Sequence, residues 1–169
     1  MKTEFKTPKG LFWELKREFN FTLDVCALSW NAQCKSYFTP EDNGLLKKWS
    51  GVCWCNPPFD KTQGQWVRKA WEEAQNGCTV VLLFPGNYHD TQWFHRFALR
   101  SSEIRYFRGR PKFKNKSGKE NAMRCILLVF RPGCSGPPEV SSITRDGAQY
   151  NFEAVENPAT NAGSQPGKK

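Results

Sequence analysis

"GVCWCNPPFDKTQGQWVRKAWEEAQNGCTVVLLFP", residues 51–85, contains a strand, a helix and a second strand in succession. "GVCWC" is a short apolar run, and "CTVVLLFP" is a longer one of the kind found in strands covered on both faces. The segment between them ends at Asn76-Gly77, a natural helix stop. One helical face of this segment carries apolar side chains, at Trp66, Val67, Ala70, Trp71 and Ala74. The succession predicts parallel strands with a helix packed against them.

The same alternation continues on both sides of this unit. Helical spacing of apolar residues predicts helices over 9–20 and 91–100, the second with Thr91 as its N-cap. Apolar runs predict strands over 21–27, 103–107 and 125–130. The last two strands have no helical pattern between them, so we expect them to pair antiparallel at an edge. The predicted fold class is α/β, a mostly parallel sheet with an antiparallel edge strand.

Composition divides the 169 residues into one domain and a C-terminal extension. Residues 1–131 carry the predicted strands and helices. After Arg131 the chain is rich in Pro, Gly, Ser and Asn. We expect a small extension over 132–156, with a hairpin turning at Asp146-Gly147, and a disordered tail over 157–169.

Charge and cysteine content narrow the class of protein. The formal net charge of +9 favours an anionic partner, most often nucleic acid. No apolar run reaches the length of a membrane span, so no membrane partner is expected. The N-terminal segment "MKTEFKTPKG" lacks the apolar core of a signal peptide, and seven cysteines are spread through apolar runs. These features favour the reducing cytoplasm and free thiols.

Cys53 and Cys55 form a C-x-C pair, but no second cysteine pair or matching histidine pair completes a zinc site. Alternate positions on a strand share one face. We therefore expect both thiols in the core and predict no metal site.

Polar groups follow several of the predicted strands. Asp24, Asn56 and the turn Pro85-Gly86-Asn87 come where strands end, and ligands of open parallel sheets bind beyond these ends. Because proline restricts its own backbone and that of the preceding residue, Asn56-Pro57-Pro58 holds carbonyl acceptors in a rigid cluster. Such a cluster suits an exocyclic amine, with Phe59 stacking on the attached ring. The alternative is a strand-ending turn with a core phenylalanine.

The sequence resembles the small Dam-like DNA N6-adenine methyltransferases of bacteriophages and prophages. "NPPF" at residues 56–59 matches their (N/D)PP(Y/F/W) motif. The resemblance covers about residues 5–130 and includes, in order, "TPKGLFWEL", "FTLDVCA", "YFTPEDNGL", "WCNPPF", "TQWFH" and "RGRPKF".

This resemblance implies a Rossmann-like S-adenosylmethionine-dependent methyltransferase fold and methyl transfer to N6 of a flipped adenine. The side chain of Asn56 and the carbonyl of Pro57 would accept the amine hydrogens, with Pro58 and Phe59 completing the catalytic motif. Cofactor contacts are implied for a second set: Thr7, Pro8, Asp24, Ala27 and Asp42.

Within this set, Thr7-Pro8 would lie near the methionine end of S-adenosylmethionine and Asp24 would pair with its amino group. The alternative for Asp24 is a strand-end cap. Asp42 is chosen over Glu41 and Asn43 for the ribose or adenine. The sequence departs from many methyltransferases because "DVCALSWNAQC", after Asp24, contains no glycine.

A basic loop between the last two strands is the expected DNA contact. Clustered charges also form ordinary solvated faces. Phosphate binding by this loop would make affinity strongly dependent on salt. Its residues are Arg108, Arg110, Lys112, Lys114, Lys116 and Lys119.

Other substrates and a non-catalytic function are alternatives to DNA methylation. RNA bases or protein glutamine are alternative substrates, and a catalytically silent nucleic-acid-binding protein is a third hypothesis. The sequence leaves the oligomeric state open between a monomer and a weak dimer. For a phage-encoded protein, the bacterial host cytoplasm is the expected location.

Overall fold

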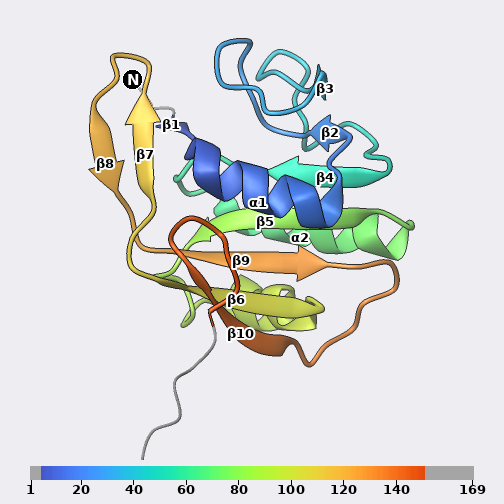
Figure 1. Ribbon diagram of the computed structural model, residues 1–169. Helices are drawn as coiled ribbons and strands as arrows, with labels where there is room; N and C mark the ends of the chain where they lie inside the picture. Colours follow the sequence, from blue (N-terminus) through green and yellow to red (C-terminus); the bar gives the residue numbers. More distant parts are fainter. Residues whose placement is uncertain (1–4, 151–169) are drawn as a thin grey trace, which may run out of the picture.

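The computed structural model describes residues 5–150, which form two β-sheets and flanking helices (Figure 1). The main sheet has seven strands in the order β10-β6-β9-β5-β4-β2-β3. Their bounds are β2 Leu23–Asp24, β3 Ser36–Tyr37, β4 Val52–Cys55, β5 Thr79–Pro85, β6 Glu103–Arg108, β9 Cys125–Phe130 and β10 Glu139–Thr144. The α/β class and the mostly parallel sheet predicted from the sequence are confirmed.

The antiparallel strand lies inside the sheet. β9 pairs antiparallel with both β5 and β6, whereas the other neighbours in the sheet are parallel. The predicted pairing of 103–107 with 125–130 is therefore confirmed, but its predicted position at an edge is wrong. All six residues of β9 are apolar and buried, which requires neighbours on both sides and cover on both faces.

The edge beyond β6 is formed by β10, in a segment expected to lie outside the main domain. β10 pairs in parallel with β6 from Glu139 opposite Glu103 to Thr144 opposite Arg108. The boundary after residue 131 is thus wrong, because residues 139–144 complete the sheet. Around the Asp146-Gly147 turn, Ile143 forms an antiparallel bridge with Gln149. The rest of the predicted hairpin, from residue 151, and the predicted tail over 157–169 lie outside the described residues.

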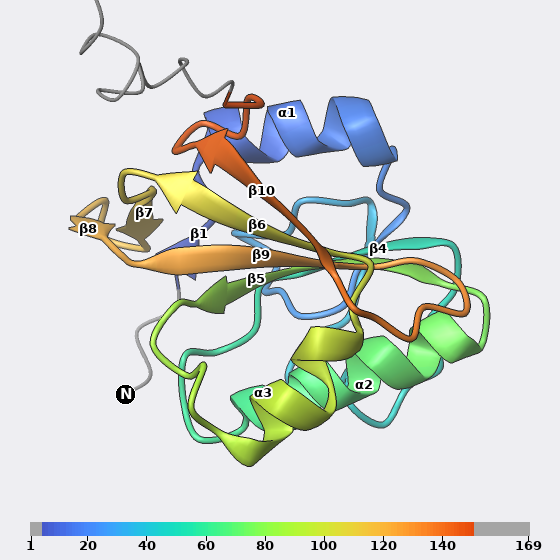
Figure 2. The same ribbon diagram turned by 90° about the horizontal axis from the view of Figure 1, so that it is seen from below.

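Helices cover both faces of the main sheet (Figure 2). α1 (Lys9–Phe19) packs on one face through four buried side chains, Leu11, Phe12, Leu15 and Phe19. The other face carries α2 (Gln63–Gln75), α3 (Gln92–Arg96) and the 3₁₀ turn η1 (Ala98–Arg100). β5 supplies both cores, because Val81 and Leu83 join the α1 side whereas Val80, Leu82 and Phe84 join the α2 side. The single helix predicted over 91–100 is divided at Phe97, and the Thr91 N-cap is present.

Cys53 and Cys55 lie in the core, as predicted from the sequence. Cys53 and Cys55 are both 0% exposed and pack on the α2 side of the sheet. Burial raises the pKa of both thiols well above the ordinary range. None of the seven cysteines, all of which lie within residues 5–150, forms a disulfide.

A second sheet stands at the end toward which β5 points (Figure 2). It consists of β1 (Phe5–Lys6), β7 (Lys112–Asn115) and β8 (Glu120–Ala122), all antiparallel, in the order β1-β7-β8. The basic segment expected to be a loop is therefore a β-hairpin over much of its length. Pairing with β1 joins Phe5 and Lys6 to this hairpin.

A buried ionic cluster ties α1 to the edge half of the main sheet. The guanidinium of Arg105 on β6 is 3% exposed and donates two hydrogen bonds of 2.6 Å to Glu18 on α1. It also binds Glu103, which Arg131 contacts from a more exposed position. Burial opposes the charge of Arg105, but hydrogen bonds to both carboxylates raise its pKa above the ordinary value.

We expect Arg105→Met to lower the free energy of unfolding by about 3 kcal/mol, because it leaves partly buried carboxylates without their main partner. Urea denaturation measures this difference. Arg131→Met is the matched control: its side chain is 48% exposed, so its loss should cost about 1 kcal/mol or less. Equal losses for the two variants would contradict the assigned role of burial.

Candidate active site

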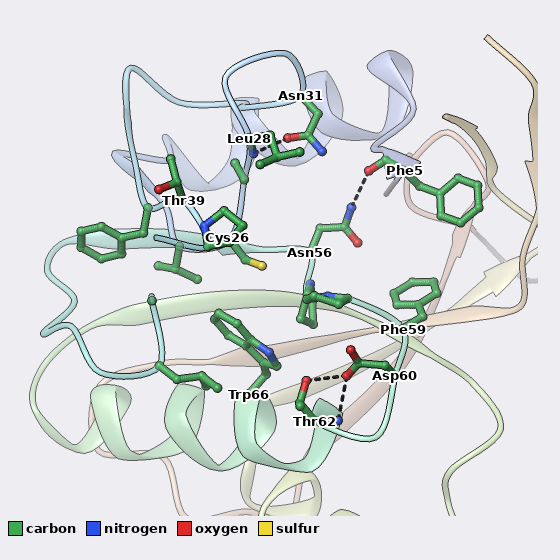
Figure 3. Close-up of a pocket in the computed structure, with 18 of the residues that line it drawn as sticks. Phe5, Cys26, Leu28, Asn31, Thr39, Asn56, Phe59, Asp60, Thr62 and Trp66 are labelled. Atoms are coloured by element: carbon green, nitrogen blue, oxygen red, sulfur yellow. Dashed lines mark hydrogen bonds between the residues drawn. The ribbon is translucent and has the colours of Figure 1, made fainter. Parts of the chain in front are cut away.

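A pocket of about 460 Å³ opens where β2, β3 and β4 end (Figure 3). The segments that follow these strands supply most of its wall. Ligand sites of parallel sheets occupy this position. The lining residues are Phe5, Val25, Cys26, Ala27, Leu28, Asn31, Phe38, Thr39, Pro40, Asn43, Gly44, Leu45, Asn56, Pro57, Pro58, Phe59, Asp60, Thr62, Trp66 and Met123.

The side chain of Asn56 is oriented by the N-terminal segment. Its Nδ2 donates to the carbonyl of Phe5 at 3.4 Å and to Oγ1 of Thr7 at 3.3 Å. A backbone carbonyl can only accept, so the amide nitrogen must face it. Oδ1 is consequently turned away from the Phe5 carbonyl, and the close-up shows it on the side of the pocket where the ring of Phe59 lies (Figure 3).

Pro57, Pro58 and Phe59 continue the pocket wall from Asn56. The ring of Phe59 packs edge-on against Phe113 of β7, with 6.2 Å between ring centroids. Asp60 then begins a turn in which its Oδ1 accepts from the backbone N–H and the hydroxyl of Thr62. This turn leads into α2 and fixes the path of the chain after the aromatic residue.

Asp24 lies behind the pocket wall and does not line it. Its side chain is 2% exposed, and its two oxygens accept from the backbone N–H of Cys26 at 3.3 Å and of Gln33 at 3.0 Å. The carboxylate thus closes the loop after β2, as expected of a strand-end cap. Burial raises the pKa of Asp24 to about 6, although these hydrogen bonds oppose the shift.

The loops that follow β2 and β3 are in close backbone contact at the pocket wall. A Cβ atom on Gly44 would lie 2.2 Å from the carbonyl oxygen of Val25, so only glycine permits this approach. The carbonyl of Gly44 accepts from Nε1 of Trp49 at 2.8 Å. Ala27, predicted as a cofactor contact, is part of the wall formed here.

Asp42 is not a lining residue. Its Oδ2 accepts from the backbone N–H of Thr39 at 2.9 Å and from the Thr39 hydroxyl at 3.0 Å. These bonds lower the pKa of Asp42. The polar groups of this loop that do line the pocket are Thr39 and Asn43.

The other two predicted cofactor residues also lie outside the wall. Thr7 is 3% exposed and its hydroxyl contacts Asn56. Pro8 is the N-cap of α1 and its carbonyl accepts from Phe12 at 3.0 Å. The structure thus brings Thr7 to the Asn56–Phe59 motif, whereas Pro8 begins α1.

The six basic residues predicted to contact DNA are all exposed. Arg108 ends β6, two of the lysines lie on β7, and the remaining residues lie in the adjoining turns. Lys112 and Lys114 flank Glu120 of β8 at 3.9 Å and 3.4 Å. The hairpin that carries them contacts the pocket through Phe113 and Phe59.

Several lining residues were missed by the sequence analysis. Phe5 contributes a backbone carbonyl, which no side-chain pattern reveals. Trp66 was recognised only as part of an apolar helix face, yet its ring also reaches the pocket. The Asp60-Lys61-Thr62 turn could have been found, because aspartate two residues before threonine favours such turns.

Two further sequence-based expectations concern the third predicted strand-end group and membrane-spanning segments. The turn Pro85-Gly86-Asn87 does not line the pocket, and Asn87 is exposed. Within residues 5–150, none of the helices is long and apolar enough to cross a membrane.

Comparison with known proteins places the chain in a family. Residues 1–150 match the family model Dam, described as DNA N-6-adenine-methyltransferase. A DNA N-6-adenine-methyltransferase of Haemophilus phage HP1 is 32% identical over 134 residues, covering 75% of this chain and 77% of that protein. One of Escherichia phage T1 is 28% identical over 104 residues, covering 59% of this chain and 42% of that protein.

Among solved structures, a predicted O-methyltransferase, protein Atu636 from Agrobacterium tumefaciens, gives a TM-score of 0.37 at 13% identity, over 73% of this chain and 62% of that chain. This score is too low to support an inference. The family model spans all of the described residues, and the motif at Asn56–Phe59 lies in the pocket wall. The chain belongs to the Dam family of DNA N-6-adenine-methyltransferases.

Proposed function

We propose that this protein transfers a methyl group from S-adenosylmethionine to the exocyclic N6 amine of adenine in DNA. The orientation of Asn56 carries the proposal, because its amide nitrogen is held by Phe5 and Thr7 while its oxygen faces the pocket. The names of the phage relatives and of the family support the reaction and the substrate.

The pocket fits the proposed methyl donor in size and charge. Its volume of about 460 Å³ falls in the range of small-molecule sites, roughly 300–1,000 Å³. The whole chain has a formal net charge of +9, yet none of the lining residues within the described part is Lys, Arg or His. A cationic ligand would therefore meet carbonyl, amide and hydroxyl groups without a facing positive side chain.

S-adenosylmethionine, when bound, supplies an activated methyl group on a positively charged sulfonium. In the half of the pocket after β2 and β3, Asn31, Thr39 and Asn43 offer polar groups among apolar side chains. We assign this half to the donor, with Ala27 in its wall. Asp24 would act on the donor through the loop that its carboxylate holds closed.

The half of the pocket formed by Asn56–Asp60 suits the adenine. The lone pair of an aromatic amine is delocalised into the ring, which makes the nitrogen a poor nucleophile. Oδ1 of Asn56 and the carbonyl of Pro57 would accept its two hydrogens and favour a pyramidal nitrogen. Preorganised acceptors of this kind stabilise the transition state more than the ground state. Phe59 would stack on the base after it leaves the duplex.

The methylated nitrogen carries a positive charge and becomes acidic, so it can lose its extra proton to water and no dedicated general base is needed. The ionisable groups in the wall are Asp60, which binds Thr62, and Cys26. The exposed lysines and arginines of the hairpin would bind phosphates and hold the DNA over the pocket.

The direct test uses labelled S-adenosylmethionine, unmethylated DNA and nucleoside analysis. We expect labelled N6-methyladenine as the product, because the acceptor pair recognises an exocyclic amine. RNA and protein are incubated in parallel under the same conditions. Label in RNA or protein alone would replace the proposed substrate, and failure to bind the donor as well as to transfer a methyl group would favour a silent nucleic-acid-binding protein.

We expect Asn56→Ala to reduce methyl transfer by about 10²–10³-fold or more, the scale for loss of one preorganised transition-state partner. Affinity for the donor, measured by calorimetry, should change little. Asn56→Asp keeps an acceptor oxygen but turns another oxygen toward the carbonyl of Phe5, so its activity should be intermediate. Wild-type turnover by Asn56→Ala would exclude the assigned role.

Asp24 should make donor binding dependent on pH. Its pKa of about 6 means that the loop is held by a carboxylate at pH 7 and by a protonated acid at pH 5. We expect affinity to fall about tenfold between these pH values as the acceptor oxygens weaken. Calorimetry at each pH measures the change.

The raised pKa of Asp24 also predicts that protonation of this carboxyl at low pH does not unfold the protein. A folded pKa raised from 3.8 to about 6 favours the folded state when the carboxyl is protonated, and this contribution is lost as the pH rises through 6. The thermal midpoint recorded at each pH therefore separates loss of binding from loss of structure. Asp24→Asn should bind weakly at every pH, and an unchanged pH dependence in that variant would assign the titration to another group.

A further inference from the structure

The small sheet β1-β7-β8 has two chemically different faces. Successive side chains of a strand point to opposite sides. On β7, Phe113 is fully buried, whereas the side chains of Lys112 and Lys114 are 58% and 62% exposed. One face of the sheet is therefore apolar and turned toward the pocket, and the other is basic and turned toward solvent.

The apolar face holds the catalytic motif at two points. The ring of Phe113 packs edge-on against Phe59 at 6.2 Å and against Phe5 at 6.4 Å. The carbonyl of Phe5 also accepts the amide hydrogen of Asn56. The rings of Phe5 and Phe59 lie on the same side of the pocket, next to Asn56 (Figure 3). The positions of both motif residues consequently depend on this sheet.

The basic face has an unbalanced row of charges across its strands. Lys114 lies directly opposite Lys6 of β1 and opposite Glu120 of β8. Like charges at directly opposed positions destabilise a strand pair. Glu120 offsets part of the repulsion, and Lys112 adds a further cation near it. A chain of phosphates would relieve the remaining excess and fits this face.

We infer that the β1-β7-β8 sheet couples phosphate binding on its basic face to the placement of Phe59 and Asn56 on its apolar face. Phe113 is then a positioning residue that acts through Phe59. The coupling is mechanical, because close-packed rings transmit a displacement of the strand that carries them. This inference rests on the proposed function, since it specifies how the DNA backbone prepares the base site. The hairpin would then contribute to the rate of methyl transfer as well as to the affinity for DNA.

The first experiment detects the coupling without methyl transfer. 4-Fluorophenylalanine is placed at position 59, and its ¹⁹F resonance is followed while inorganic polyphosphate is added. Polyphosphate offers repeating anionic charge but no base. We expect the resonance to shift in the otherwise unchanged protein and to stay unmoved in Phe113→Leu and in the double variant Lys112→Ala/Lys114→Ala. An unmoved resonance with polyphosphate bound to the unchanged protein overturns the inference.

The second experiment separates turnover from binding. Phe113→Leu should lower apparent kcat on unmethylated DNA about tenfold, since small misplacements of reacting groups are costly, while the KM for DNA and the affinity for S-adenosylmethionine stay within twofold. Phe130→Leu is the matched control: Phe130 is also 0% exposed but pairs with Val80 at the opposite end of β5. Its turnover per folded molecule should equal that of the unchanged protein.

A double-mutant cycle completes the test. Lys114→Ala should raise KM and lower kcat alone, but should have no further effect on kcat when Phe113→Leu is present. Additive effects on kcat would show that the two faces act independently and would overturn the coupling. If DNA is not methylated but the polyphosphate-induced shift is observed as expected, the proposed substrate fails while the coupling within the sheet stands.

Discussion

The hydrogen bond from the Asn56 amide to the carbonyl of Phe5 orients the polar side chain at the start of the Asn56–Phe59 motif. Because a carbonyl only accepts, the amide nitrogen must turn toward β1 and its oxygen toward the cavity. Thr7 reinforces this orientation with its hydroxyl. The bond joins residues 51 positions apart, so the orientation of Asn56 depends on β1, which pairs with β7 of the hairpin. The rigid prolines hold the backbone, and β1 holds the side chain.

The main sheet places Asn56, which follows β4, close to β1 and the hairpin. β4 and β5 are central strands whose side chains reach both cores, so their ends are rigid platforms for the segments that follow. The antiparallel β9 returns the chain between β5 and β6, and the hairpin β7-β8 precedes it at the same end of the sheet. The placement of β9 thus brings the basic hairpin beside the pocket. Arg105 keeps the outer strands joined to α1 through Glu18.

Charge is divided between the pocket and its surroundings. The wall of the pocket holds no basic side chain among the described residues, while the neighbouring hairpin is rich in lysine. This separation suits the proposed reaction, in which a cationic donor would enter the pocket and a polyanionic acceptor would meet the basic hairpin. Phe113 lies between the two surfaces, with one ring contact to the catalytic motif. The basic hairpin and the Asn56–Phe59 motif are therefore joined by a direct ring contact.

Local signals determined most of the elements and the central motif. Apolar periodicity located α1, α2, β4, β5, β6 and β9, and Asn56-Pro57-Pro58-Phe59 could be recognised from its own letters. Tertiary structure decided what depends on distant partners. β10 has too few apolar residues to be recognised as a strand and is placed by its pairing with β6 and by buried Ile143, and β9 is interior because β5 and β6 flank it. Thr7, Asp24 and Asp42 matched motif positions, but their polar atoms hold other parts of the site instead of lining the pocket. The physical reason is that a sequence specifies which groups can hydrogen-bond, whereas the packed chain decides which partner lies within reach.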